Sequence, residues 1–316
     1  MYSLRPNVRH PQLIGAIDLA LYWRHFAEKL YVLLGGSMIT ILDGGVGQEL
    51  IGRSATAPTP LWATEVLLEE PNLVRAVHDD FFAAGAVVAT TNSYTIHHDR
   101  LITAGLDEQF EALHRAACEI ACASREAAGG GSVAGAIGPL IGSYQTGALP
   151  QDAVERFAEI CRIQAPYVDH FLIETVSALD HVRATLAGAS GHGKPVWLSV
   201  SVDDYDGTKM RSGEALELVL DIIDDADALL VNCATPEAVT MAVDVIKSCE
   251  KPFGAYANGF TEITQNFVQV GATVQELSTR TDLSPEIYAD FAEERAKIGA
   301  TIIGGCCEVG PAHIAE

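Results

Sequence analysis

Eight short apolar runs, each followed by a small or polar loop and then by a longer stretch with helical spacing, limit most strongly how this chain can fold. Continuous apolar strands that alternate with helices form a parallel sheet covered on both faces. Eight such units predict that the sheet closes into an α/β fold of the (β/α)8 TIM-barrel type. The runs span residues 38–42, 86–90, 133–137, 171–173, 196–200, 228–231, 253–256 and 301–303.

The stretches between these runs have the apolar spacing of amphipathic helices. Two of them open with a capping residue before proline, Thr235-Pro236 and Ser284-Pro285, which is a typical helix start. The predicted helices span residues 71–84, 107–127, 151–168, 178–189, 213–223, 236–247 and 285–298.

An open, doubly wound sheet is the alternative architecture. Such sheets usually carry a G-x-G-x-x-G phosphate-binding motif after an early strand, and residues 43–47, Asp-Gly-Gly-Val-Gly, do not match it. No low-complexity linker interrupts residues 38–316, so we predict a single barrel domain there. Residues 1–37 are moderately apolar but interrupted by charges, which predicts a helical N-terminal extension. Residues 311–316 provide barely one turn of the eighth helix.

The net charge and the cysteine content limit the kinds of partner and location that we expect for the protein. A net charge of −22 argues against nucleic acid and against an anionic membrane surface, because both repel an acidic protein. No apolar run is long enough to span a membrane. Seven cysteines, an odd number without the dense spacing of a disulfide scaffold, indicate a reducing, cytoplasmic location. The expected partners are small molecules, and a homo-oligomer is compatible with the sequence.

Chemically capable side chains follow most of the predicted strands. In a TIM barrel the active site lies at the carboxyl ends of the strands, where the loops after the strands meet. Carboxylates, thiols and amides therefore converge on one rim, as expected for a small-molecule site. The candidate residues are Asp43, Thr91, Asn92, Glu174, Asn232, Cys233, Cys306 and Cys307.

The cysteines at this rim predict a metal site. Side chains of neighbours on a regular strand point to opposite faces, so Cys306 and Cys307 reach one ion only if the backbone leaves the pleat, which Gly304 and Gly305 permit. Cys233, at the end of the sixth strand, supplies a third thiolate. Three thiolates favour Zn²⁺ with a fourth position open for water or substrate. For the Cys306-Cys307 pair taken alone, two ordinary buried cysteines are the alternative.

Two further sets of polar residues follow predicted strands, and for both we expect a surface loop rather than a functional site. His97 and His98 follow the second strand, and we expect a solvated loop pair. Asp203, Asp204 and Asp206 lack the full spacing of a calcium-binding loop, so an exposed acidic turn is expected.

These motifs resemble those of the homocysteine S-methyltransferase family over about residues 38–314. The resemblance implies a zinc-containing barrel that transfers a methyl group to the thiol of homocysteine, giving methionine. It leaves S-methylmethionine, S-adenosylmethionine and betaine open as the sulfonium or ammonium donor. The motifs that carry it are Asp43-Gly44-Gly45, Thr91-Asn92-Ser93-Tyr94, Gly138-Pro139, Glu174-Thr175, Val231-Asn232-Cys233 and Gly304-Gly305-Cys306-Cys307.

The resemblance also implies roles for individual residues. The three rim cysteines would hold Zn²⁺, and Asp43 and Glu174 would be the catalytic and homocysteine-binding carboxylates. Thr91, Asn92 and Asn232 would shape the substrate pocket.

Two other functions stay open. A corrinoid-partnered methyltransferase or demethylase component would act on a small methylated substrate only with its partner protein. A hydrolase or lyase would use Asp43 and Glu174 as acid and base beside a structural metal, and its activity would survive zinc removal.

Overall fold

The computed structural model of the chain describes residues 38–55, 61–269 and 274–316. The predicted helical extension over residues 1–37 lies outside the described residues. Eight parallel strands form one sheet in the order β1-β8-β7-β6-β5-β4-β3-β2. The strands are β1 Thr40–Ile41, β2 Val88–Thr90, β3 Ser132–Ile137, β4 His170–Val176, β5 Val196–Val200, β6 Ala228–Asn232, β7 Phe253–Ala257 and β8 Ile302–Gly305.

The sheet closes on itself between its first two strands. A parallel bridge joins Leu42 to Val88, and the amide of Val87 donates to the carbonyl of Ile41 at 2.9 Å. Strands that are consecutive in the sequence are therefore neighbours around the ring, and β8 pairs with β1. This arrangement confirms the predicted (β/α)8 TIM barrel and excludes the doubly wound sheet, whose strand order reverses at its centre.

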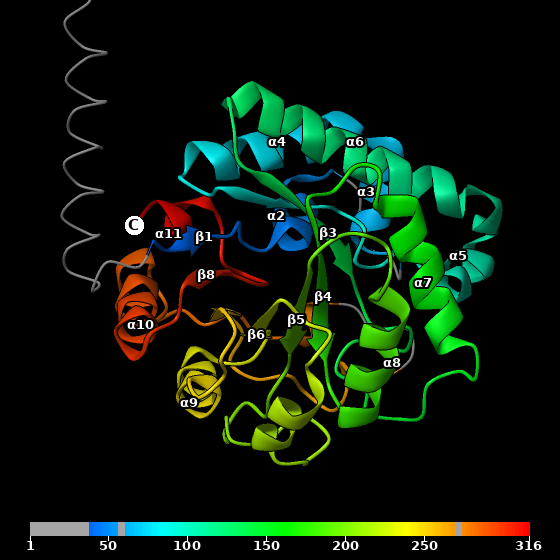
Figure 1. Ribbon diagram of the computed structural model, residues 1–316. Helices are drawn as coiled ribbons and strands as arrows, with labels where there is room; N and C mark the ends of the chain where they lie inside the picture. The colour runs from blue at the N-terminus through cyan, green and yellow to red at the C-terminus, as the bar shows by residue number, and fades with distance from the viewer. Residues whose placement is uncertain (1–37, 56–60, 270–273) are drawn as a thin grey trace, which may run out of the picture. The chain divides into compact units, whose positions relative to one another are not determined.

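The interior of the barrel is filled by side chains from alternate positions of the strands. They include Leu42, Leu172, Leu230 and Tyr256, all buried. A larger apolar core lies between the outer faces of the strands and the helices, which ring the barrel in Figure 1. All eight predicted strands occur, because a strand buried on both faces must be apolar throughout.

Most predicted helices also occur. Thr235 and Ser284 cap their helices as expected, each accepting a hydrogen bond from a backbone amide of the first turn. Residues 213–223 differ, since only a 3-10 helix forms there. The short helices α2, α3 and α5 were not predicted from the sequence.

The helices are α2 Val46–Arg53, α3 Ala63–Glu69, α4 Pro71–Ala83, α5 His98–Ala104, η1 Asp107–Gln109, α6 Phe110–Ala128, α7 Ala153–Gln164, α8 Leu179–Ala189, η2 Leu216–Ile222, α9 Pro236–Ile246, η3 Val274–Glu276, α10 Pro285–Ile298 and α11 Pro311–Ala315. Across the described ranges, none of these helices has the length and apolar character needed to cross a bilayer.

Glycines allow the loop after β1 to lie directly against the turn after β8. A Cβ atom on Gly45 would stand 2.6 Å from the carbonyl oxygen of Cys306, and one on Gly44 would stand 2.0 Å from that of Val309. A Cβ on Gly305 would meet the side chain of Val309 at 2.1 Å. Close backbone approach, rather than a left-handed conformation, is therefore what glycine provides here.

Gly45→Ala is expected to lower the free energy of unfolding by about 1–3 kcal/mol, because the new methyl group overlaps the backbone of Cys306. Gly52 in α2 is the matched control, since a Cβ there meets nothing within 4 Å. Gly52→Ala should raise stability by about 0.4–1 kcal/mol. Urea unfolding of both variants measures the difference, and equal effects would contradict the close approach.

Candidate functional site

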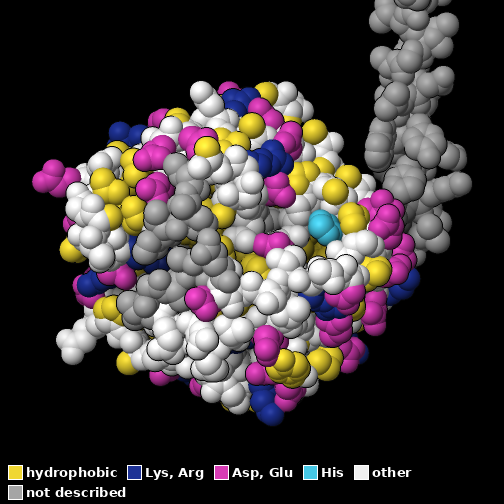
Figure 2. Space-filling model, turned by 180° about the vertical axis from the view of Figure 1, so that it is seen from behind, with side chains coloured by type: hydrophobic (Ala, Val, Ile, Leu, Met, Phe, Trp, Pro, Cys, Tyr) yellow, Lys and Arg dark blue, Asp and Glu magenta, His cyan; other side chains and the backbone are white. Residues whose placement is uncertain are grey.

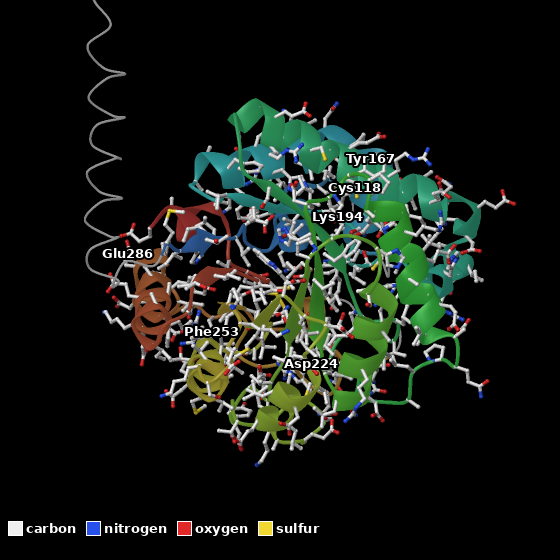
Figure 3. The ribbon with its side chains drawn as sticks, in the orientation of Figure 1. Cys118, Tyr167, Lys194, Asp224, Phe253 and Glu286 are labelled. Atoms are coloured by element: carbon white, nitrogen blue, oxygen red, sulfur yellow. A yellow bond between two sulfur atoms is a disulfide. The ribbon has the colours of Figure 1, made fainter. Side chains whose placement is uncertain are left out.

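A cavity of about 890 Å³ opens at the carboxyl ends of the strands. Figure 3 labels Tyr167, Lys194, Asp224 and Phe253 beside the amino ends of β4 to β7, and none of these four lines the cavity. The view from behind shows a hollow near the centre of the face, with acidic side chains around it (Figure 2). Seven of the eight predicted site residues line the cavity, namely Asp43, Thr91, Asn92, Glu174, Cys233, Cys306 and Cys307.

The three rim cysteines come together as predicted. Their Sγ atoms all lie within 4.8 Å of one another, with Cys233 directly after β6 and the other two directly after β8. Cys233 and Cys306 are joined by a disulfide, whereas Cys307 is free. The prediction from the sequence is that all three bind Zn²⁺ as thiolates. Sulfurs this close can share one ion when reduced or pair with each other when oxidised, so the cluster fits a metal only in its reduced form.

The remaining thiol is held in its neutral form. Burial raises the pKa of Cys307 to about 12, and the nearby carboxylates Glu308 and Glu174 act in the same direction. A cation among the sulfurs would reverse this, because a metal ion deprotonates the thiols that bind it. The donor set of three cysteine sulfurs is therefore suited to a soft or borderline metal ion.

Backbone strain is concentrated at the cavity. Five non-glycine residues of the described chain have positive φ, and four of them line the cavity: Trp62, Tyr144, Thr175 and Cys233. The fifth, Glu308, follows Cys307. Such backbone angles cost roughly 1–3 kcal/mol each and persist only where surrounding contacts hold them.

A buried ion pair holds the Cys233 loop. Asp204 and Arg211 form two hydrogen bonds of 2.7 and 2.8 Å, and Arg211 also donates to the backbone carbonyl of Cys233 at 3.0 Å. The same guanidinium lies 5.0 Å from the ring centre of Tyr144. Asp204 further accepts from the amide of Ile263 at 2.8 Å. The expected exposed acidic turn is thus wrong for Asp204, which is only 7% exposed, because Arg211 and the backbone of Ile263 enclose its carboxylate.

Two carboxyl groups lie inside the cavity without a basic partner. Burial raises the pKa of Asp43 to about 7, even though the amide and hydroxyl of Thr90 both donate to it at 2.6 Å. Burial also raises the pKa of Glu174 to about 8, partly offset by the neighbouring Tyr256 phenol. No Lys or Arg in the described ranges pairs with either carboxyl. Both groups would gain from a cationic ligand.

The predicted polar residues mostly hold the loops. Thr91 accepts from the amide of Ala136 at 2.9 Å, and the Asn92 side chain donates to the carbonyl of Ala63 at 2.9 Å. Their contact with substrate stays a prediction.

Asn232 lies one layer below the cavity and does not line it. It accepts from the amide of Thr175 at 3.0 Å and from the hydroxyl of Ser199 at 2.9 Å. It therefore holds the end of β4, the strand that carries Glu174.

Other features of the site were missed by the sequence analysis. Tyr288 on α10 joins the ends of β7 and β8, donating to the carbonyl of Gly304 at 2.6 Å and accepting from the amide of Ala257 at 3.1 Å. Aromatic side chains also wall the cavity, and apart from Tyr94 no quoted motif contains them, because they come from separate segments of the chain. These are Trp62, Tyr94, Tyr144, Tyr256, Phe260 and Phe267.

The expected solvated histidine pair is wrong for His97, which is only 2% exposed. Its neighbour His98 lies 2.6 Å from the carboxylate of Asp107 and 3.2 Å from that of Glu159. Burial of the loop against α6 and α7 explains the difference, and neither histidine lines the cavity.

Arg211→Met is expected to lower the free energy of unfolding by about 3 kcal/mol, because it leaves the Asp204 carboxylate buried and unpaired. The control is Arg183→Met, which removes an exposed pair with Asp180 and should cost no more than about 1 kcal/mol. Urea unfolding of the reduced protein compares the two. If both variants lose a similarly small free energy of unfolding, the buried pair does not hold the Cys233 loop.

Comparison with known proteins places this site in a family. Residues 40–316 match the family described as homocysteine S-methyltransferase. The homocysteine S-methyltransferase of Escherichia coli (strain K12) is 30% identical in an alignment 319 residues long. The alignment covers 91% of this chain and 97% of that protein. The crystal structure of the homocysteine methyltransferase MmuM from Escherichia coli, metallated form, has a TM-score of 0.71 at 28% identity, covering 90% of this chain and 97% of that one. The oxidized form of MmuM has a TM-score of 0.72 with the same identity and coverage. This chain belongs to the homocysteine S-methyltransferase family.

Proposed function

We propose that this enzyme transfers a methyl group from a sulfonium or ammonium donor to the thiol of homocysteine, giving methionine, with Zn²⁺ held by Cys233, Cys306 and Cys307. The observation that carries the proposal is the approach of these three sulfurs to within 4.8 Å in a cavity that also contains two buried carboxyl groups. The reaction requires an activated thiol, a binding position for the ammonium group of homocysteine and a binding position for the cationic methyl donor.

Zinc fits the sulfur donors better than a harder ion does. Three cysteine thiolates leave one tetrahedral position for a substrate, as in catalytic zinc sites. The ion, when bound, would keep the homocysteine thiol ionised and nucleophilic at neutral pH. MmuM has been crystallised in metallated and in oxidized forms, which supports a site in this family that exists in both states. Reduction of the Cys233–Cys306 disulfide must precede metal binding here.

The two carboxyl groups give the acceptor its orientation. Asp43 and Glu174 would receive the ammonium group of homocysteine, because an opposite charge relieves the burial that raises both pKa values. Thr90 holds the Asp43 carboxylate in place through two hydrogen bonds. The homocysteine side chain then extends toward the cysteine sulfurs.

The aromatic walls suit a cationic donor. The rings of Trp62 and Tyr94 lie 6.1 Å apart in an edge-to-face arrangement, and both line the cavity. Aromatic faces attract sulfonium and quaternary ammonium groups. In the transfer, the homocysteine sulfur provides the electron pair of the new S–CH₃ bond. The old bond to the methyl carbon breaks, and the donor leaves as a neutral thioether or amine with that electron pair. The main requirement is then that the homocysteine sulfur, the methyl carbon and the leaving atom of the donor lie in line.

The alternative of a corrinoid-partnered reaction is not favoured. Relatives from Escherichia coli, Zea mays and Bacillus subtilis carry the name homocysteine S-methyltransferase, and no observation in the described residues points to a corrinoid partner.

The proposal is tested by measuring the metal content of reduced protein and methionine formation from homocysteine with S-methylmethionine, S-adenosylmethionine and betaine offered in parallel. About one equivalent of zinc and turnover with one of these donors are expected. Zinc without methyl transfer from any donor would contradict the proposed reaction, and the absence of zinc would contradict the metal site.

Cys306→Ala should abolish both zinc binding and methyl transfer, because two thiolates hold the ion weakly. Cys249→Ala is the control, since Cys249 is a free cysteine that does not line the cavity. It should keep both properties. Zinc retained at one equivalent in Cys306→Ala would refute the ligand assignment.

The affinity for norvaline, the thiol-free isostere of homocysteine, should rise with pH. Below a pKa of about 7 for Asp43 and about 8 for Glu174, the carboxyls are protonated and cannot pair with an ammonium group. Calorimetric titration from about pH 6 to about pH 9 should show an increase of up to roughly tenfold per pH unit for each group that ionises. The slope should be shallower in Asp43→Asn. An affinity that is flat or falls with pH would contradict this role.

A further inference from the structure

A charged side chain without a partner lies on the α5 side of the cavity. Arg100 lines the cavity together with Asp99, Thr103 and Ala104 of the same helix. It is only partly exposed, and no hydrogen bond or ion pair to it occurs among the described residues. The residues that interact with its charge are Tyr94 and Asp99. An arginine in this state has its donors available to a ligand.

The other arginines at the cavity differ in this respect. Arg156, which also lines the cavity, pairs with Asp152 at 2.9 Å, and Arg211, which lies behind the Cys233 loop and does not line the cavity, is held by Asp204 at 2.7 Å. Burial lowers the pKa of the Arg100 guanidinium, and its two neighbours offset only part of that effect. A guanidinium nevertheless keeps its charge in proteins and binds carboxylates through two parallel hydrogen bonds. A carboxylate ligand would therefore be stabilised strongly at this position.

The position of Arg100 assigns that carboxylate to one of the two substrates. The acceptor must place its sulfur at the cysteines and its ammonium group at Asp43 and Glu174, all at the strand ends. Arg100 belongs to α5, which starts at His98, eight residues after β2 ends at Thr90 and beyond the strand ends. A cavity of about 890 Å³ is near the upper limit for small-molecule sites, roughly 300–1,000 Å³, and has room for a second substrate on this side.

We propose that Arg100 binds the carboxylate of the methyl donor, so that the methylated cation and the carboxylate of the donor are recognised separately. This inference rests on the proposed function and adds a donor-binding residue to the same site. Tyr94 lines the same cavity as Arg100, and its hydroxyl lies 2.9 Å from that of Ser143. The carboxylate bound by Arg100 would thus hold the cationic methyl group beside the Tyr94 ring and direct it toward the acceptor sulfur.

The test compares Arg100→Gln and Arg100→Lys with the wild-type enzyme, with S-methylmethionine and its carboxyl methyl ester as donors. Arg115→Gln is the charge-matched control, because Arg115 forms an exposed pair with Glu111 outside the cavity. Donor and homocysteine KM values are measured separately. Calorimetric titration with S-methylmethionine gives donor binding without turnover, and urea unfolding verifies that each variant is folded.

Arg100→Gln should raise the KM and the Kd for S-methylmethionine by about 10- to 100-fold, the usual size of a charge-assisted hydrogen bond. Arg100→Lys should show a smaller rise, since lysine keeps the charge and loses the two-point geometry. The homocysteine KM should change less than about twofold, and the methyl ester should not distinguish wild type from Arg100→Gln. Arg115→Gln should match the wild type.

An unchanged donor KM in Arg100→Gln, or a rise in the homocysteine KM instead, would overturn the inference while the methyltransferase function stands. Absence of methyl transfer from every donor in the wild type would refute the proposed function, and the titrations would still show whether Arg100 binds the carboxylate of S-methylmethionine. Failure of the wild type to bind S-methylmethionine would also overturn the inference.

Discussion

Contact between the ends of β1 and β8 is the constraint on which the rest of the site depends. The loop after β1 carries Asp43, and the turn after β8 carries two cysteines. The two segments touch because Gly44, Gly45 and Gly305 leave no side chain between them. The carbonyl of Asp43 accepts from the amide of Gly305 at 3.0 Å, which ties the carboxylate loop to the cysteine turn. Barrel closure then brings Cys233, which follows β6, to the same place, so the positions proposed for acceptor binding and for thiol activation share one rim.

The electrostatics of the site depend on pairing some buried charges and leaving others unpaired. Asp204 and Arg211 satisfy each other below the Cys233 loop and stiffen it. Among the residues that the structure describes, no Lys or Arg pairs with Asp43 or Glu174 at the cavity, and no carboxylate forms an ion pair with Arg100. Unpaired buried charge destabilises the free protein, and a ligand of opposite charge recovers that free energy on binding. A zwitterionic acceptor and a zwitterionic donor are the ligands that match this pattern.

The strands and the cysteine cluster could be predicted from the sequence, but much of the supporting structure could not. Continuous apolar runs identify strands buried on both faces. The first residues that follow each run are then placed at or near the rim, as for Glu174 and Cys233. Asp204 was misread because its partner Arg211 is recognised only when a loop folds back. The short helix α5 was missed, and Arg100 with it. The disulfide between Cys233 and Cys306 was not predicted either, since spacing along the chain does not reveal which sulfurs come within bonding distance.

The central claim is that three cysteine sulfurs hold zinc with one position left for the homocysteine thiol. Zinc X-ray absorption spectroscopy of the reduced, metal-loaded protein, recorded without and with homocysteine, tests it most directly. The account predicts about three sulfur neighbours at about 2.3 Å in the free enzyme and about four once homocysteine is added. Fewer than three sulfur neighbours, or an unchanged spectrum on adding homocysteine, would contradict it.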